Sequence, residues 1–340
     1  MQKFEKHSPV VVTEVTTKHE LRQFMQYPNR LYADNPNYIP SFYGDDLSDW
    51  TPGKNPAFDY CEARCWLAWR DGEIVGRIGA ILSHKANDKF GTHRMRFSQV
   101  DFVDDSEVSA ALFGMVERWA REKGCDQVHG PLGFTDMDRE GMLVEGFDRR
   151  SLFFTNYNAP YYLEHLTRLG YRKDVDWIEY RITVPAPGSA EAARLHKLSE
   201  FILKRKNLHV ATVHHKSEYG PFVRQVFELV NAAYAPLYGV VELSDEQIER
   251  YANKFIPLVD PDFVCFVLDE QDKLVAFGVT ALDPSVALKH SDGRLFPFGW
   301  AGVLNDLHHS DTLIMLLTAV RPDLQTEGTN AVMMDHVCQS

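Results

Sequence analysis

A polar loop near the C-terminus has the residue pattern of a phosphate-binding site. It reads Gln325-Thr326-Glu327-Gly328-Thr329-Asn330, and it lies between an apolar run that ends at Val320 and an apolar helical stretch. The first amides of a helix have no intrahelical partner, and the helix dipole favours an anion there. A glycine lets the anion approach the backbone. We therefore predict a pyrophosphate site, although an ordinary strand-to-helix turn would use the same glycine.

A second loop carries carboxylates that could move a proton. Residues 129–148 read HGPLGFTDMDREGMLVEGFD, which is too polar and glycine-rich for a core and long for a connection. An amine nucleophile arrives protonated, and a carboxylate can take its proton. Asp136, Asp138 and Glu145 are the candidate general bases. The same side chains could instead cap local turns or recognise a cationic acceptor.

The elements that position these loops form an internal repeat. Residues 65–82 are two β-rich runs around Asp71-Gly72, a strong hairpin signal, and residues 264–282 repeat the pattern around an acidic turn. Ile74-Val75-Gly76 aligns with Leu274-Val275-Ala276. Each hairpin follows helical segments and precedes a strand that runs into a helix, at 94–124 and at 311–340. The pattern predicts a duplicated supersecondary unit.

The two copies differ at the candidate phosphate loop. The first reads Val103-Asp104-Asp105-Ser106-Glu107, with no glycine and three carboxylates that would repel a phosphate. Asp104 or Asp105 would serve as the N-cap of the following helix, which Gly124 would end. We therefore expect only the C-terminal copy to hold an anionic ligand.

This element order resembles the GNAT superfamily of acetyl-CoA-dependent N-acyltransferases. In that family the loop is Gln or Arg, two residues, Gly, one residue, then Gly or Ala. Gln325 and Gly328 match, Val320 and Pro322 fit the strand exit, and Asn330 departs from the small residue. Loop 129–148, followed by the Tyr157–Tyr162 segment YNAPYY, resembles an uncharacterised bacterial branch of the superfamily.

The resemblance implies an α/β fold of two GNAT-like domains, each a mixed, mainly antiparallel twisted sheet flanked by helices. We place the domains at 1–184 and 191–340, with a linker at 185–190 (PAPGSA) after the strand-like stretch WIEYRITV. A complete second domain would continue with a strand, a helix carrying a tyrosine that reprotonates the coenzyme A thiolate, and two more strands. We therefore expect it to be truncated after Ser340, rather than abbreviated and borrowing strands from the first.

The resemblance also implies an N-acetyltransferase that uses acetyl-CoA or another acyl-CoA. The implied donor-binding residues are Val320, Gln325, Thr326, Glu327, Gly328, Thr329 and Asn330. A small-molecule or peptide amine would meet loop 129–148 and the cleft between the halves, and would attack a thioester polarised by a strand amide. Two alternatives stay open: a non-catalytic descendant that binds a ligand or partner, and a tandem transferase using a charged tRNA.

Composition limits the partners. A chain of 340 residues favours two domains, and the net charge of −12 disfavours nucleic acid, charged tRNA and anionic membrane surfaces as partners. No apolar run reaches the ~18 residues of a membrane span, and the N-terminus lacks a signal-peptide core. Five cysteines read as reduced thiols, which favours a cytoplasmic protein. Cys61 and Cys65 have no second pair nearby, so no metal site is expected.

Overall fold

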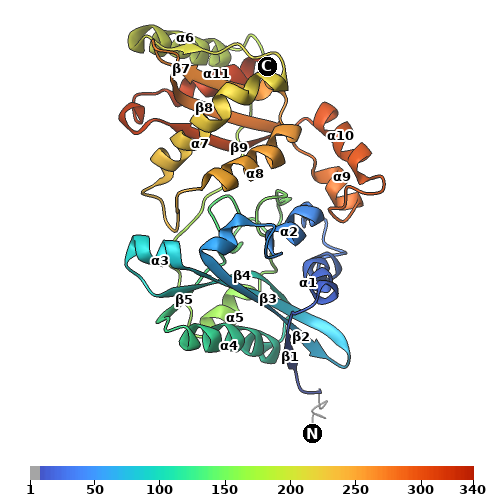
Figure 1. The fold of residues 1–340 in the computed structure, drawn as a ribbon. Coiled ribbons are helices and arrows are strands. Elements are labelled where there is room, and N and C mark those ends of the chain that lie inside the picture. The colour runs from blue at the N-terminus through green and yellow to red at the C-terminus, as the bar shows by residue number, and fades with distance from the viewer. Residues whose placement is uncertain (1–7) are drawn as a thin grey trace. The chain divides into compact units, whose positions relative to one another are not determined.

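The computed structural model describes residues 8–340, which form two compact units (Figure 1). The first unit runs to Trp177 and includes residues 285–303, and the second comprises residues 178–284 and 304–340. The predicted division differs in two respects. The predicted linker at 185–190 lies inside the second unit, and a segment of the C-terminal half belongs to the first. The predicted domain bounds, 1–184 and 191–340, stay a prediction.

The first unit contains a five-stranded sheet in the order β1-β2-β3-β4-β5. All neighbouring strands are antiparallel except β4 and β5, which are parallel. The elements of this unit in chain order are β1 (Val11–Glu14), α1 (Lys18–Leu31), α2 (Tyr43–Asp49), β2 (Cys61–Arg70), β3 (Glu73–Ser83), α3 (His84–Phe90), β4 (Arg94–Phe102), α4 (Ser106–Glu122), β5 (Gln127–His129) and α5 (Tyr162–Arg168).

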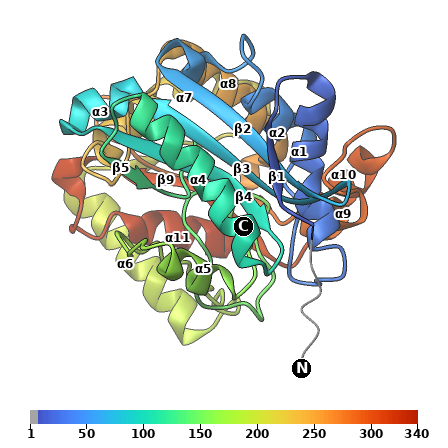
Figure 2. The same ribbon diagram turned by 90° about the horizontal axis from the view of Figure 1, so that it is seen from below.

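Both faces of this sheet are covered. Alternate residues of a strand point to opposite faces, so Trp66 and Ala68 pack in the core under α4, whereas Cys65 and Leu67 pack in the core under α1. Figure 2 shows α4 crossing the strands. Burial on both faces explains why the central strands read as nearly continuous apolar runs.

The second unit contains a four-stranded antiparallel sheet in the order β6-β7-β8-β9. Its elements are α6 (Ala190–Lys206), β6 (His209–Val210), α7 (Gly220–Tyr234), α8 (Asp245–Phe255), β7 (Val264–Leu268), β8 (Leu274–Leu282), β9 (Leu313–Val320) and α11 (Asn330–Gln339). Helices α6 and α11 lie side by side, and their apolar residues share one core cluster with β7 and β8. Among residues 8–340, β9 is an edge strand of this sheet.

The sheet register confirms the predicted repeat. In the first hairpin, Gly76 pairs with Ala68 and Ile74 with Trp69, which leaves Val75 as a bulge. The second hairpin has the same irregularity at Val275, between the pairs Ala276–Val267 and Leu274–Leu268. The two bulged valines are the ones aligned from the sequence.

The strand after each hairpin is also bulged. In β4, Gln99 and Val100 lie opposite Ile78 alone, and Gln99 adopts φ +46°. In β9, the ladder passes over Leu316. A bulge bends its strand and redirects side chains, and bulges are frequent beside active sites.

The predicted strand at residues 177–184 is wrong. The segment forms neither helix nor strand, and Ile178, Tyr180 and Ile182 are 71%, 77% and 64% exposed. Alternating β-formers favour an extended backbone, but a strand forms only where a neighbouring strand supplies hydrogen bonds and packing.

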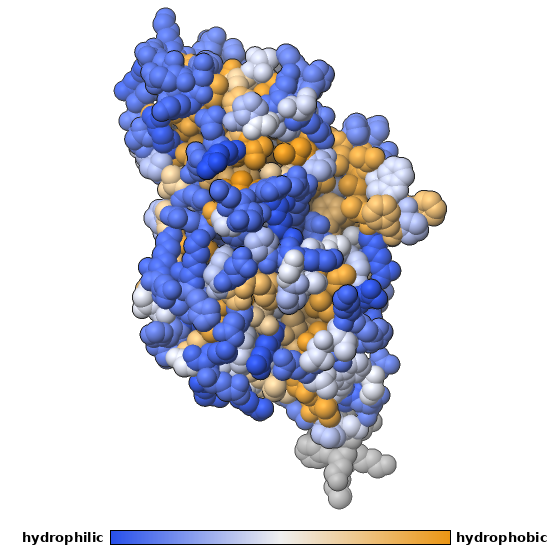
Figure 3. All heavy atoms as spheres, in the orientation of Figure 1, coloured by the Kyte–Doolittle hydropathy of each residue, from blue (hydrophilic) through white to orange (hydrophobic). Residues whose placement is uncertain are grey.

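Residues 285–303, which we call the strap, leave the second hairpin and pack within the first unit. The strap contains α9 (Ser285–His290) and the start of α10 (Gly299–His309). The Tyr43 amide donates to the Gly293 carbonyl over 2.9 Å, and Asn29 Nδ2 donates to the Asp292 carbonyl over 3.0 Å. Figure 3 shows apolar side chains over this segment, where the exposed members are Val286, Phe296, Phe298 and Trp300.

Candidate functional site

The glycine loop of the second unit leaves several amides without partners. The chain exits β9 into a short 3-10 turn (Pro322–Leu324), and the amides of Gln325 and Glu327 then donate to carbonyls of that turn region. Among residues 8–340, the amides of Thr326, Gly328, Thr329 and Asn330 donate no hydrogen bond. They precede or open α11, a helix whose N-cap Thr329 provides no side-chain cap. Such a cluster of free N–H groups can bind an anion.

Gly328 also has a structural reason to be glycine. It adopts φ +85°, and a Cβ there would lie 3.0 Å from Ile202 Cδ1 on α6. An ordinary strand-to-helix turn would therefore also require glycine at this position. Evidence for a ligand role comes from the free amides and the charges around them.

Cations flank the loop. Lys206, at the end of α6, pairs with Glu327 at 2.8 Å. This hydrogen bond, with the Coulombic effects of Lys206 and Arg205, lowers the pKa of Glu327. Gln325 Nε2 donates to the carbonyl of Val320 over 3.0 Å, which joins two of the predicted donor-binding residues. The predicted residues thus form one contiguous loop beside a basic helix end.

The equivalent loop of the first unit is occupied by its own carboxylates. Asp105 caps α4 by accepting from the amides of Glu107 and Val108. Arg70 pairs with Asp105 at 2.5 Å and with Glu107 at 2.7 Å. Hydrogen bonds from Arg70 and from these amides outweigh burial and lower the pKa of Asp105. A phosphate would find the helix-start amides already bound to Asp105, and it would be repelled by the carboxylates.

Loop 129–148 closes over the β4–β5 edge in the first unit. The strands pair only from Arg94 to Arg96, and the Leu132 amide then donates to the carbonyl of Phe97 over 3.0 Å. The Gly141 amide donates to the carbonyl of Pro131, which folds the loop on itself.

The three predicted general bases have different surroundings. Asp138 Oδ2 accepts from the amides of Phe134 (2.7 Å) and Thr135 (3.2 Å), which is the turn-capping alternative. Glu145 is exposed. Asp136 has a buried Oδ2 with no partner among residues 8–340, and burial raises the pKa of its carboxyl. A catalytic role for any of them stays a prediction.

Glu140 is a titratable group that the sequence reasoning did not select. Burial, with Asp136 and Asp138 adding repulsion, raises the pKa of its carboxyl to about 8 despite the opposing charge of Arg96. The sequence offered little reason to select Glu140, because it is one of five acidic residues in the loop and the sequence does not show which of them is buried.

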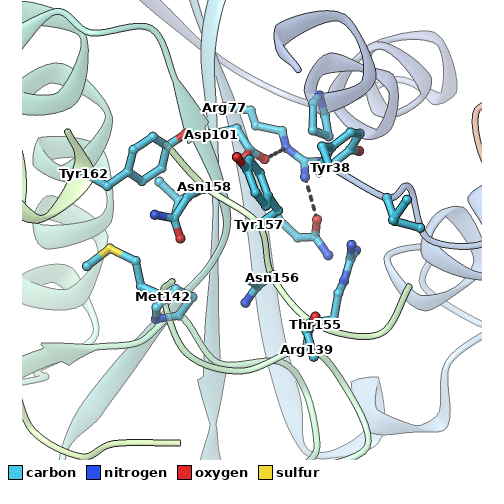
Figure 4. Close-up of a pocket in the computed structure, with 15 residues that line it drawn as sticks. Tyr38, Arg77, Asp101, Arg139, Met142, Thr155, Asn156, Tyr157, Asn158 and Tyr162 are labelled. Atoms are coloured by element: carbon cyan, nitrogen blue, oxygen red, sulfur yellow. Dashed lines mark hydrogen bonds and ion pairs between the residues drawn. The ribbon is translucent and has the colours of Figure 1, made fainter. Parts of the chain in front are cut away.

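A polar cavity lies between the sheet and this loop in the first unit (Figure 4). Its volume of about 30 Å³ is two to three times the ~10–15 Å³ that one water needs. The residues that line it are Pro28, Tyr38, Ile39, Arg77, Gln99, Val100, Asp101, Pro131, Arg139, Met142, Thr155, Asn156, Tyr157, Asn158 and Tyr162.

A buried ion pair forms the sheet side of the cavity. Arg77 Nε donates to Asp101 Oδ2 over 2.7 Å, and Nη2 donates to Gln99 Oε1 over 2.8 Å. Both charged side chains are almost fully buried, and burial raises the pKa of Asp101 against the opposing charge of Arg77. Tyr162 donates or accepts at 2.8 Å with Tyr32, and also accepts from the Phe102 amide.

The opposite side of the cavity comes from loop 129–158. Arg139 Nη2 donates to Asp46 over 2.8 Å, and Asn156 Nδ2 donates to the Gly141 carbonyl. Sequence reasoning missed Arg77, Asp101 and Arg139. The available signal was a charged residue inside each of two buried strands, which is rare unless the charges are paired.

Neither a metal-binding cluster nor a membrane-spanning helix is found among residues 8–340. Among residues 8–340, no group of three His, Cys, Asp or Glu side chains could hold a metal ion. In the same part of the chain, no helix has the length and apolarity needed to cross a bilayer.

Two curated relatives match most of the chain, whereas no family model matches it. Protein YghO of Escherichia coli is 28% identical over 298 residues, covering 86% of this chain and 74% of YghO. A bacterial ceramide synthase of Caulobacter vibrioides is 29% identical over 299 residues, covering 86% of this chain and 75% of the synthase.

Among solved structures, a GCN5-related glucosamine N-acetyltransferase region of a fungal multidomain GH3 β-N-acetylglucosaminidase matches with a TM-score of 0.51. The match has 10% identity and covers 99% of this chain and 34% of the fungal chain. The chain has a tandem GNAT fold. The predicted fold class is thereby confirmed, with the closed loop in the first GNAT unit and the open glycine loop in the second.

Proposed function

We propose that this chain is an acyl-CoA-dependent N-acyltransferase whose second GNAT unit holds the donor. The observation that carries the proposal is the set of free amides at Thr326, Gly328, Thr329 and Asn330. They would bind the pyrophosphate of coenzyme A, with Lys206 offsetting the charge of Glu327 in the loop and Arg205 adding positive charge. The name of the Caulobacter relative supports an N-acylation, because a ceramide is an amide.

The donor residues predicted from the sequence keep their roles in this proposal. Val320 ends β9, and Gln325 holds the strand exit against the loop through its hydrogen bond to the Val320 carbonyl. Within the described chain no strand pairs with the outer edge of β9, although Tyr234 and Gln325 donate to its Thr318 and Val320 carbonyls. The remaining backbone groups of this edge could pair with the extended arm of the donor. Acetyl-CoA and a longer acyl-CoA are both compatible with this backbone-based recognition.

The reaction would be a direct transfer. The nitrogen lone pair of a neutral amine attacks the thioester carbonyl, the C–N bond forms, the C–S bond breaks, and the amine proton leaves so that free coenzyme A thiol and an amide remain. The acceptor would be a small-molecule or peptide amine, and the cytoplasmic location stays a prediction.

Release of free thiol from acetyl-CoA and from palmitoyl-CoA tests this proposal. With a panel of primary amines, including amino acids and long-chain amino alcohols, a catalyst releases thiol in proportion to amide formed. Donor binding without amine-dependent thiol release would instead favour the non-catalytic alternative. The first unit, whose equivalent loop is occupied by its own carboxylates, motivates that alternative. Absence of donor binding by the folded chain would contradict both the donor site and the activity.

A further inference from the structure

We propose that the cavity of the first unit binds the carboxylate group of a small ligand, with Arg139 as the principal contact. This site lies wholly within the first unit and is separate from the glycine loop of the second.

The guanidinium of Arg139 has N–H donors without a hydrogen-bond partner among residues 8–340. A guanidinium carries five N–H groups, and its side chain is only 16% exposed. Nη2 donates to Asp46, whereas no other hydrogen bond of this guanidinium exists among residues 8–340. Gln99, on the opposite side, uses its Oε1 to accept from Arg77, and its amide N–H groups have no partner in the same part of the chain. Both residues line the cavity, Arg139 from the loop (Figure 4) and Gln99 from β4.

The two arginines that line the cavity are each paired with one carboxylate, and a third cation lies near it. Arg77 pairs with Asp101 and Arg139 pairs with Asp46. A third cation, Lys289 of the strap, donates to the carbonyls of Asn35 (2.5 Å) and Tyr38 (2.8 Å) and lies over the Tyr38 ring. No carboxylate among residues 8–340 forms an ion pair with Lys289. Lys289 does not line the cavity, and the charge of Asp292 acts on it, so the unpaired N–H donors of Arg139 rather than an excess of charge would hold a bound anion.

The size of the cavity selects the kind of anion. Its volume of about 30 Å³ suits two or three non-hydrogen atoms, whereas complete ligands occupy roughly 300 Å³ or more. A planar carboxylate fits this space and matches the fork of an arginine. Only the acidic end of the ligand would enter, with the remainder passing out between the loop and the sheet.

The ligand class that follows is a small carboxylic acid, and an amino acid is the member of that class that also carries an amine. That its amine is the acyl acceptor rests on the proposed function, whereas binding of its carboxylate does not.

Calorimetric titration of the full chain with three matched amines tests the site. Glycine and ethanolamine share an amine and differ in the carboxylate, and O-phosphoethanolamine replaces it with a larger tetrahedral anion. We expect glycine to bind at least tenfold more tightly than either other compound. Equal binding of ethanolamine would overturn the carboxylate site, and tighter binding of O-phosphoethanolamine would replace it with a phosphate site.

Variants locate the contact. Arg139→Gln should weaken glycine binding at least tenfold, and Arg149→Gln, an exposed arginine of the same loop, should not. If Arg139→Gln alone fails to fold, Asp46→Asn/Arg139→Gln removes both charges together and keeps the cavity neutral. Unchanged glycine binding in either folded variant would overturn the proposal. Glycine binding without glycine-dependent thiol release would leave this site standing and contradict only the assignment of the bound amine as the acyl acceptor.

Discussion

Asn330 and Ser106 open equivalent helices in the two GNAT units, and the residues before them carry different charge. In the first unit, Asp105 fills the helix start with its own carboxylate, which Arg70 then neutralises. In the second, the helix start has no acidic residue in its first turn and no side-chain cap. The difference of a few side chains separates a closed helix end from one that can accept an anion.

Glu140 gives a residue-scale prediction about pH. Because its folded pKa of about 8 lies above the ordinary value of 4.5, the folded chain binds the proton more tightly. Its contribution to stability is therefore present below pH 4.5 and is lost as pH rises toward 8. Glu140→Gln should raise the free energy of unfolding relative to the parent by on the order of 2 kcal/mol more at pH 8.5 than at pH 5.

Urea unfolding at the two pH values measures this difference. The low pKa of His129, about 4 because of burial, acts with the opposite sign but is common to both proteins and cancels. A gain that is equal at pH 5 and pH 8.5 would show that Glu140 is ionised in the folded chain.

At the scale of elements, the glycine loop depends on α6. Gly328→Ala would place a methyl group 3.0 Å from Ile202 Cδ1 while keeping a φ of +85° that favours glycine. We expect a loss of about 2 kcal/mol in the free energy of unfolding. Adding Ile202→Val removes the opposing methyl and should recover only the steric part. Full recovery in chemical denaturation would mean that the backbone conformation costs nothing.

Local patterns predicted these elements well. The hairpin at Asp71-Gly72, the α4 cap at Asp105 and the repeat offset all depend on residues close in sequence. The strand prediction for residues 177–184 failed because a strand forms only beside a neighbouring strand, which the composition of the segment does not reveal.

The cavity was not predictable for a related reason. Arg77 and Asp101 lie 24 residues apart on different strands, and Arg139 arrives on a loop whose path no periodicity describes. The position of the strap was even less predictable from the sequence, because Lys289 donates to the carbonyl of Asn35, 254 residues earlier in the chain. Such contacts depend on tertiary packing rather than local propensity.

At the scale of the whole molecule, the strap ties the two halves of the sequence together within the first unit. Gly293 is a tightly packed point of the strap: it has φ +75°, and a Cβ would lie 1.9 Å from the Ser41 carbonyl oxygen. Gly293→Ala should therefore raise hydrogen–deuterium exchange in residues 285–303 and 38–46, while β7 and β8 keep their protection. Gly44→Ala, with open space around its Cβ, is the matched control. Unchanged exchange in the strap would contradict its anchoring role.

The donor site is the central claim, and calorimetric titration of acetyl-CoA into the parent chain and Asn330→Asp tests it most directly. An aspartate at the start of α11 should stabilise the helix by about 0.5 kcal/mol, so the variant folds. Its charge would nevertheless repel the pyrophosphate and weaken binding about tenfold or more. Gln127→Glu, the same charge change on β5 of the first unit, should bind like the parent. Binding that is equal in Asn330→Asp and the parent, or absent from the folded parent, would contradict the account.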